Sequence, residues 1–275
     1  MSAPTPAAPS PAELYDSVYV PAIFDRVAPL LLQRAAPRAG ETVLDLACGT
    51  GIVARSLAPL VGPGGRIVAL DLRPGMLAVG RARAAPSGAA IEWKQGDALA
   101  LELTDDSFDL VVCQQGLQFF PDRPGALREA RRVLRSGGRI ALAVWQSLES
   151  HPIFAELAEV EVRHLSALGV TPEDAGAPFS LGSRDALEST LEQGGFEGIE
   201  IAPARITARF PSAASFIRDI EYPYSAFMPQ FVQDPPQFDA FVEAVARETG
   251  ALVERYRVGD AVEFPMHTHI ATATA

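Results

Sequence analysis

A glycine-rich turn follows a short apolar segment and constrains the fold of this chain more than any other feature. Val43–Leu46 has the apolar character of a buried strand, and Asp45 falls near its end. Gly49 and Gly51 then allow a turn in which the backbone passes close to a ligand. Asp71 follows twenty residues later, at the end of the next expected strand, where a carboxylate can bind a ribose. This spacing predicts a nucleoside-type cofactor at the carboxyl ends of a parallel sheet.

Segments with strand and helix periodicity alternate along the first half of the chain and then become less regular. Strict alternation of this kind predicts an α/β fold, a Rossmann-like doubly wound sheet with helices on both faces. The expected strands are 43–46, 66–70, 91–95, 108–113, 139–145, 199–210 and 261–273, and the expected helices are 51–60, 73–84, 125–134, 153–168 and 184–193.

Three segments lie outside this minimal sheet. Residues 12–36 have helical apolar spacing, and Pro21 and Pro29 are expected to break them into short helices. Connections as long as the two later segments usually carry function, so we expect residues 12–30, 150–182 and 211–258 to close over the cofactor. The predicted organisation is a disordered tail (1–11), N-terminal cap helices (12–36), a cofactor-binding core (37–146), a cap insertion (147–182), a core continuation (183–210), a second cap insertion (211–258) and a final core strand (259–275).

Charge and cysteine content restrict the partners. A formal net charge of −11 argues against a broad basic surface, so nucleic acid and an anionic membrane are poor partners. No apolar run reaches the roughly 18 residues of a spanning helix, and the N-terminus lacks the pattern of a signal peptide. The two cysteines, Cys48 and Cys113, form no disulfide framework and suit the cytoplasm. We expect both to be free, buried thiols without a catalytic role.

Five motifs, which include the glycine turn and Asp71, lead to a family resemblance. They are DLACGTG at 45–51, ALDL at 69–72, GDA at 96–98, FDLVVCQQGLQFF at 108–120 and LREARRVLRSGGR at 127–139. With them the chain resembles the class I S-adenosylmethionine-dependent methyltransferases, in the small-molecule branch similar to the ubiquinone/menaquinone-biosynthesis enzymes. The resemblance is specific over residues 40–146, with Ala47 where many members have glycine.

The resemblance implies a seven-stranded sheet whose last strand is antiparallel. It also implies S-adenosyl-L-methionine as cofactor and methyl transfer to an O, N, C or S nucleophile of a small molecule. The cofactor would lie over the first two strands, near the switch point. The residues that we expect to bind it are Asp45, Ala47, Gly49, Gly51, Asp71, Leu72, Met76, Asp97, Ala98 and Gln114.

Catalytic and acceptor-binding residues are less well marked. A sulfonium activates its own methyl group, so a general base is needed only if the acceptor must lose a proton. Candidates for such a role are His151, Gln115, Gln118 and His267. His267 and His269 share one face of the last strand, but no acidic or thiol ligand has metal-binding spacing nearby, so no metal is predicted. An aromatic pocket wall, and with it a largely apolar acceptor, is expected from Tyr15, Tyr19, Phe24, Phe119, Tyr222, Tyr224 and Phe227.

Two other functions remain as alternatives. The glycine turn also fits an NAD(P)-binding oxidoreductase. Against this, Asp45 would repel a pyrophosphate, and no Tyr-x-x-x-Lys pair exists because Ala90 stands four residues before Lys94. A non-catalytic cofactor-binding protein is the second alternative. The oligomeric state and the acceptor are not indicated.

Overall fold

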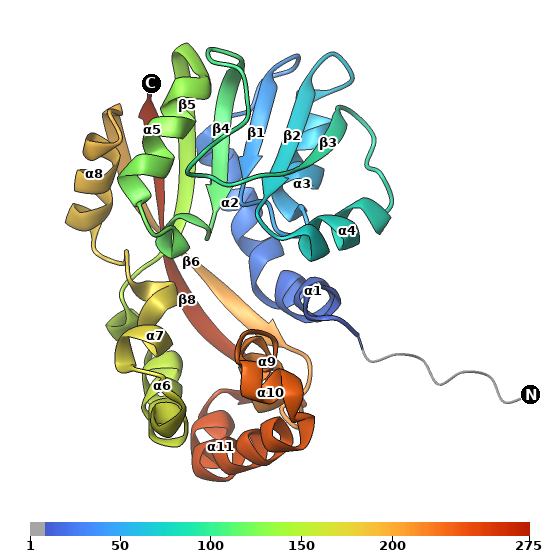
Figure 1. Ribbon diagram of the computed structural model, residues 1–275, viewed down its shortest axis with the longest axis vertical. Coiled ribbons are helices and arrows are strands. Elements are labelled where there is room, and N and C mark those ends of the chain that lie inside the picture. The colour runs from blue at the N-terminus through green and yellow to red at the C-terminus, as the bar shows by residue number, and fades with distance from the viewer. Residues whose placement is uncertain (1–8) are drawn as a thin grey trace, which may run out of the picture.

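A mixed sheet with the strand order β3-β2-β1-β4-β5-β8-β6 forms the centre of the molecule (Figure 1). The computed structural model describes residues 9–275, apart from the side chains of residues 223–227 and 229. Within that part of the chain the sheet has eight strands, because the short β7 pairs with β8. The strands are β1 (Thr42–Leu46), β2 (Arg66–Asp71), β3 (Ala90–Gln95), β4 (Phe108–Gln114), β5 (Leu134–Trp145), β6 (Glu197–Phe210), β7 (Arg257–Val258) and β8 (Ala261–Thr274).

Strand directions confirm the predicted architecture. Strands β1 to β5 are mutually parallel, whereas β8 is antiparallel to both β5 and β6. The main path therefore has the seven strands that the resemblance implies. The eighth strand was not predicted, because two residues are too few to show an alternating pattern.

Helices cover both faces of the sheet. Successive residues of a strand point to opposite faces, so Val43 packs in one apolar layer and Leu44 in the other. Helices α2 and α3 contribute to the first layer, and α5 and α8 to the second. The helical elements are α1 (Pro11–Leu14), η1 (Tyr15–Phe24), α2 (Asp25–Ala35), α3 (Ile52–Val61), α4 (Pro74–Ala82), η2 (Leu117–Phe119), α5 (Arg123–Val133), η3 (Leu148–Ser150), α6 (Pro152–Leu165), η4 (Ser166–Leu168), α7 (Pro172–Gly176), η5 (Ala177–Phe179), α8 (Arg184–Gln193), α9 (Phe216–Phe227), α10 (Pro229–Gln233) and α11 (Pro235–Arg255).

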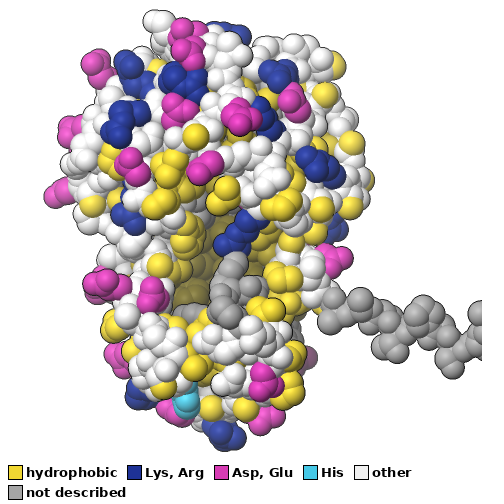
Figure 2. Space-filling view, in the orientation of Figure 1, with side chains coloured by type: hydrophobic (Ala, Val, Ile, Leu, Met, Phe, Trp, Pro, Cys, Tyr) yellow, Lys and Arg dark blue, Asp and Glu magenta, His cyan; other side chains and the backbone are white. Residues whose placement is uncertain are grey.

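The two long insertions lie together beyond the carboxyl ends of the parallel strands. Strands β6 and β8 extend past the rest of the sheet, and α6, α7 and α9–α11 gather around this extension (Figure 1). We call α6, α7 and α9–α11 the helical cap. Its apolar side chains belong to the same buried cluster as those of α2 and α3, so cap and core share one apolar layer. Between them the surface is hollowed and lined by hydrophobic side chains (Figure 2).

The N-terminal helical segment differs from the prediction. Helical backbone continues from α1 through η1 to α2, with Pro21 inside η1 and Pro29 inside α2, so the expected breaks at these prolines were wrong. η1 is a π-helix, whose bonding offset differs from that of α2. Each proline lacks a backbone N–H, so one hydrogen bond is missing at its position while the helical path continues. Residues 1–8 of the predicted tail lie outside the described residues, and α1 begins at Pro11.

Among the described residues, no helix combines the length and the apolar character needed to cross a lipid bilayer.

Candidate cofactor and acceptor site

The loop between β1 and α3 has left-handed backbone at three positions. Their φ angles are 56° at Ala47, 56° at Gly49 and 81° at Gly51. Glycine adopts such angles at little cost, whereas Ala47 pays a steric penalty for its Cβ atom. Asp45 lies beneath the loop and is 1% exposed. Its Oδ2 accepts a hydrogen bond of 2.8 Å from the Ala54 N–H, which ties the loop to the first turn of α3.

Asp71 joins the end of β2 to the same loop. Its Oδ2 accepts a hydrogen bond from the Gly49 N–H at 2.8 Å, and its Oδ1 accepts one from the Arg73 N–H at 2.9 Å. Each carboxylate oxygen offers about two acceptor directions, so each retains one for a further donor. The structure thus brings together the glycine turn and the predicted ribose acid, and leaves that acid able to accept from two hydroxyls.

The buried Asp45 carboxyl indicates whether a cationic or an anionic cofactor fits this site. Its burial raises the pKa of the carboxyl group to about 8, and the nearby negative charge of Asp71 adds to this effect. The Ala54 N–H and the Arg55 guanidinium oppose the rise only in part. Buried carboxylates are stabilised by a cation. A cofactor with an ammonium group and a sulfonium group therefore fits the residues present, whereas a pyrophosphate does not.

Tyr15 covers the loop from the side of η1. A Cβ atom built on Gly49 would lie 3.5 Å from the Tyr15 hydroxyl oxygen, so any larger side chain there would meet the ring. The Tyr15 ring stacks on those of Tyr19 and Phe24, with centroids 6.2 Å and 5.2 Å apart. The Phe24 ring in turn contacts that of Trp145, with centroids 6.5 Å apart. We call Tyr15, Tyr19, Phe24 and Trp145 the aromatic wall. It includes three residues predicted to line the acceptor pocket.

Gly51 has a packing role that sequence reasoning missed. A Cβ atom built on Gly51 would lie 2.2 Å from Trp93 Cη2, and one built on Gly80 would lie 2.5 Å from Trp93 Cζ3. Trp93, on β3, therefore fills the space beside both glycines and supports the loop from below. A glycine pattern does not reveal which atoms take the space, so this tryptophan could not be found from the motif.

Three glutamines form a polar group at the end of β4. Gln114 donates from Nε2 to the Phe24 carbonyl at 3.1 Å, and its Oε1 is buried without a partner among the described residues. Gln115, with a left-handed φ of 55°, donates to Thr268 Oγ1 at 3.1 Å and accepts from Gln118 Nε2 at 3.0 Å. The unpartnered Gln114 oxygen faces no internal donor, so it is available to a ligand. Gln115 is bound by Gln118 and by Thr268 of β8, and the Oε1 atom of Gln118 is likewise buried without a partner among the described residues.

The expected adenine side is open to solvent. Leu72, directly after Asp71, is 62% exposed, which is unusual for a leucine beside a buried strand. Ala98 is buried, and Asp97 Oδ1 accepts from the Leu99 N–H at 2.9 Å in a local turn. Met76 is half-buried on α4. These positions stay predictions, and the exposed Leu72 side chain suits a planar ligand.

Two of the histidines, His151 and His269, are held by backbone groups. His151 is fully buried, with Nδ1 3.0 Å from the Ser147 carbonyl and Nε2 accepting from the His267 N–H at 2.9 Å. Burial lowers the pKa of His151, so the ring is neutral at pH 7. His269 Nε2 lies 3.1 Å from the Gly182 carbonyl. Both nitrogens of His151 are thus occupied, which favours a structural role. In the described part of the chain no metal-binding group of His, Cys, Asp and Glu occurs.

The two cysteines are free and buried, as predicted. They belong to different apolar layers, Cys48 to the layer of α2 and α3 and Cys113 to that of α5 and α8. Burial raises the pKa of the Cys113 thiol to about 12, so it carries no thiolate at neutral pH.

The acceptor candidates outside the aromatic wall are dispersed, and Tyr19 of the wall also contacts the cap. Tyr19 donates from its hydroxyl to the Ile220 carbonyl at 2.8 Å, which links η1 to α9. Tyr222 packs edge-on against Phe238 in the cap, with centroids 6.3 Å apart. Phe119, on η2, is 57% exposed. The side chains of Tyr224 and Phe227 lie outside the described residues.

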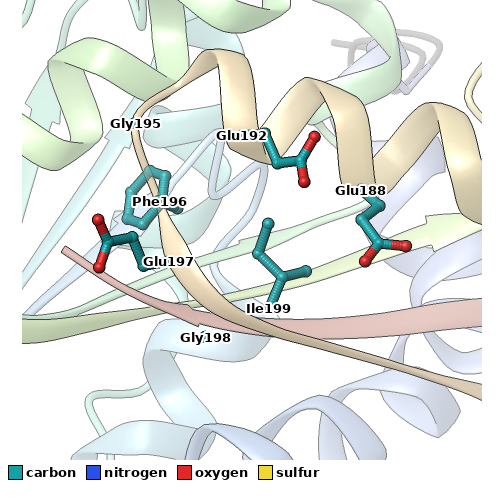
Figure 3. Close-up of a pocket in the computed structure, with 7 residues that line it drawn as sticks. All are labelled: Glu188, Glu192, Gly195, Phe196, Glu197, Gly198 and Ile199. Atoms are coloured by element: carbon teal, nitrogen blue, oxygen red, sulfur yellow. The ribbon is translucent and has the colours of Figure 1, made fainter.

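A separate acidic depression lies at the outer edge of the sheet. It is lined by Glu188 and Glu192 of α8 and by Glu197 at the start of β6 (Figure 3). Both β5 and β6 are antiparallel to β8, so β6 runs in the same direction as β5. The first residues of β6 therefore lie at the amino ends of the parallel strands, whereas the glycine loop lies at their carboxyl ends. None of the predicted site residues lines this depression.

Comparison with known proteins extends the assignment. A family model described as a methyltransferase domain matches residues 43–138. The 2-phytyl-1,4-naphtoquinone methyltransferase of Synechococcus elongatus is 42% identical over 110 residues, which cover 39% of this chain and 47% of that protein. The demethylmenaquinone methyltransferase of Lactobacillus johnsonii is 34% identical over 186 residues, covering 62% of this chain and 74% of that protein. The chain thus spans only about half the length of the first relative.

A solved structure agrees at the level of the fold. Phosphoethanolamine N-methyltransferase 2 of Haemonchus contortus, in complex with phosphomonomethylethanolamine and S-adenosylhomocysteine, is 18% identical with a TM-score of 0.57, covering 96% of this chain and 57% of that chain. At that identity the likeness concerns the fold alone. The identity and coverage of the Lactobacillus relative carry the assignment. The chain therefore belongs to the class I S-adenosylmethionine-dependent methyltransferases, in the group that includes the quinone-biosynthesis methyltransferases.

Proposed function

We propose that this chain transfers a methyl group from S-adenosylmethionine to a small-molecule nucleophile. The observation that carries the proposal is the Asp71 carboxylate, held by the Gly49 N–H at 2.8 Å with one acceptor direction free on each oxygen. The cofactor, when bound, supplies a methyl group made electrophilic by the sulfonium. The protein has to bind it, align the acceptor and exclude water.

Different residues around the loop would bind different parts of the cofactor. Asp71 would accept from the two ribose hydroxyls, and Asp45 would stabilise the ammonium group. Leu72 would pack on the adenine, which would cover its exposed side chain. The Gln114 Oε1 atom would accept from the ligand, since it has no partner among the described residues. Tyr15 would close the site above Gly49.

The acceptor would lie against the aromatic wall. The Tyr15 ring stacks on Phe24 with centroids 5.2 Å apart, and Phe24 lies tilted against Trp145 at 6.5 Å. A row of rings of this kind favours a planar, largely apolar acceptor. The quinone substrates in the names of two relatives are consistent with this. Proton removal, where an acceptor needs it, would not come from His151, whose two ring nitrogens are occupied. We further propose a cytoplasmic enzyme, supported by its free thiols, and no nucleic-acid partner, supported by the net charge of −11.

The first test is the affinity for the cofactor. We expect Asp71→Ala to lose about 1.5–3 kcal/mol of binding free energy for S-adenosylmethionine, or roughly ten- to a hundredfold in Kd, because charge-assisted hydrogen bonds are lost. Isothermal titration calorimetry measures this. The matched control is Glu92→Ala, which removes an exposed carboxylate from the neighbouring β3 and should bind like the wild type.

Methyl transfer itself is measured as S-adenosylhomocysteine formed with a panel of quinols, phenols and aromatic amines. Unchanged cofactor affinity in Asp71→Ala, or tight binding of NAD(P) by the wild type, contradicts the proposal. Cofactor binding without turnover on any acceptor would instead favour the non-catalytic alternative.

A further inference from the structure

Gln118 has a buried amide oxygen to which the cofactor site assigns no role. The residue is 3% exposed, and its Oε1 atom has no hydrogen-bond partner among the described residues. It lies on η2, which follows β4 at the end of the core that faces the cap (Figure 1). Because the oxygen is buried, solvent does not supply the missing donor, and a buried acceptor without a donor is costly. The position therefore needs an explanation.

A chain of hydrogen bonds determines which atom of Gln118 is unpaired. The Thr268 hydroxyl donates to the Val144 carbonyl at 2.7 Å, so it accepts from Gln115 Nε2 at 3.1 Å. This leaves Gln115 Oε1 as the acceptor for Gln118 Nε2, at 3.0 Å. A flipped Gln118 amide would place two oxygens face to face, so the orientation is fixed. The unpaired atom of Gln118 is therefore a hydrogen-bond acceptor.

The same chain lies beside the aromatic wall. Thr268 on β8 is directly opposite Trp145 on β5, and opposite residues of an antiparallel pair have adjacent side chains on one face of the sheet. Gln114, the last residue of β4, donates to the carbonyl of Phe24, another residue of the wall. The polar chain and the wall therefore meet at Trp145, at the carboxyl ends of β4 and β5.

The backbone around Gln118 is held in place. Its carbonyl accepts from Arg123 Nη2 at 2.8 Å and from Ser180 Oγ at 3.3 Å, which connects η2 to α5 and to the residue after η5. Gln115 has a left-handed φ of 55°, an angle that is costly for a residue other than glycine and that recurs in functional sites. A polar group fixed in this way is suited to select a ligand through one hydrogen bond.

We infer that Gln118 determines acceptor specificity: its Oε1 atom accepts a hydrogen bond from a hydroxyl or N–H group of the methyl acceptor, whose rings lie against Trp145. The inference rests on the proposed function and narrows its substrate class. The acceptor reaches this buried oxygen by displacing the side chains that cover it. An amide takes no proton at neutral pH, so Gln118 orients the donor group and is not a base. A molecule without a donor at this place leaves the oxygen unpaired and is disfavoured.

The test compares aromatic probes with and without a donor. 1-Naphthol and 2-naphthol, each beside the corresponding fluoronaphthalene, are titrated into the full-length protein saturated with S-adenosylhomocysteine. We expect at least one naphthol to bind tenfold or more tightly than its fluoro analogue, because fluorine is similar in size to a hydroxyl but donates no hydrogen bond. Gln118→Met should abolish this preference, since methionine keeps the length of the side chain and removes its oxygen. Gln193→Met, at an exposed position on α8, is the matched control and should retain it.

A second pair of variants tests the fixed orientation without changing Gln118. Thr268→Val removes the hydroxyl that anchors the chain and should weaken the preference, whereas Thr268→Ser keeps the hydroxyl and should retain it. This pair also decides the matter if Gln118→Met does not fold. The inference is overturned if no naphthol is preferred, if the preference survives in Gln118→Met, or if the two Thr268 variants behave alike. Binding of S-adenosylhomocysteine is measured first. Its absence from the wild type would refute the proposed function, whereas its presence without a naphthol preference refutes only this inference.

Discussion

At the scale of single residues, the cofactor loop depends on backbone angles as much as on side chains. Ala47 is the one residue of its three left-handed positions that is not glycine. A glycine at this position would avoid the penalty, and the sequence alone does not show that cost. The structure supplies the φ angle of 56° that makes the cost predictable.

We expect Ala47→Gly to stabilise the protein. Left-handed backbone costs an alanine about 1–2 kcal/mol, while glycine loses about 0.5–1 kcal/mol more chain entropy on folding. The free energy of unfolding should therefore rise by up to about 1.5 kcal/mol, as measured by urea denaturation. The control is Ala78→Gly, on the exposed side of α4, where the backbone is helical. Its free energy of unfolding should fall by about 1 kcal/mol. A loss of stability in Ala47→Gly would contradict the strain argument.

At the scale of elements, an ion pair of Asp16, the second residue of η1, connects this helix to the core. Asp16 is 4% exposed and accepts hydrogen bonds from Nε and Nη2 of Arg83, which follows α4. Nη2 of Arg55, on α3, lies 3.9 Å from the Asp16 Oδ1 atom. The Arg55 guanidinium also donates to the Thr50 carbonyl in the glycine loop. This contact holds Tyr15 over the loop, so the position of η1 and the cofactor site should be coupled.

Asp16→Asn should loosen this element. Hydrogen bonds to a charged group contribute about 1.5–3 kcal/mol, so we expect faster amide exchange over residues 11–24 and S-adenosylmethionine affinity lower by up to about tenfold. Hydrogen exchange with mass spectrometry and calorimetry measure the two effects. Asp25→Asn removes an exposed carboxylate from the same helical segment and should change neither. Exchange that stays at the wild-type level in Asp16→Asn would show that η1 is held by apolar packing alone.

Elements could be predicted where local pattern determines them. The strands from Val43 to Trp145 and the helix at 184–193 follow apolar periodicity and glycine stops, and they appear with shifts of a few residues. The π-helical η1 could not be predicted, because its form depends on packing against β6 and α2. The same holds for the site. The spacing in the sequence indicated Asp71 and Gly49, whereas Trp93 and Asp16 gain their roles from residues distant in sequence.

At the scale of the whole molecule, buried carboxyl groups tie stability to pH. The pKa of Asp45 is about 8 in the folded protein, against about 3.9 for an unperturbed aspartate. Between these values the folded state binds more protons than the unfolded state, so stability falls as pH rises. Glu221, whose pKa is also raised by burial, acts in the same direction. The ligand-free protein should therefore be most stable near the acidic end of this range.

Cofactor binding should reverse part of this dependence. The ammonium group beside Asp45 would lower the pKa of that carboxyl, so we expect binding to release up to one proton at pH 7, seen by calorimetry in buffers of different ionisation enthalpy. One proton corresponds to a slope of at most about 1.4 kcal/mol per pH unit. Thermal unfolding from pH 5 to 8 measures how the free energy of unfolding changes with pH. Asp45→Asn should remove the part of this slope that Asp45 contributes. Glu243→Gln, at an exposed position, should retain the full slope. Binding of S-adenosylhomocysteine without proton release would mean that Asp45 is already ionised, or that the ammonium group lies elsewhere.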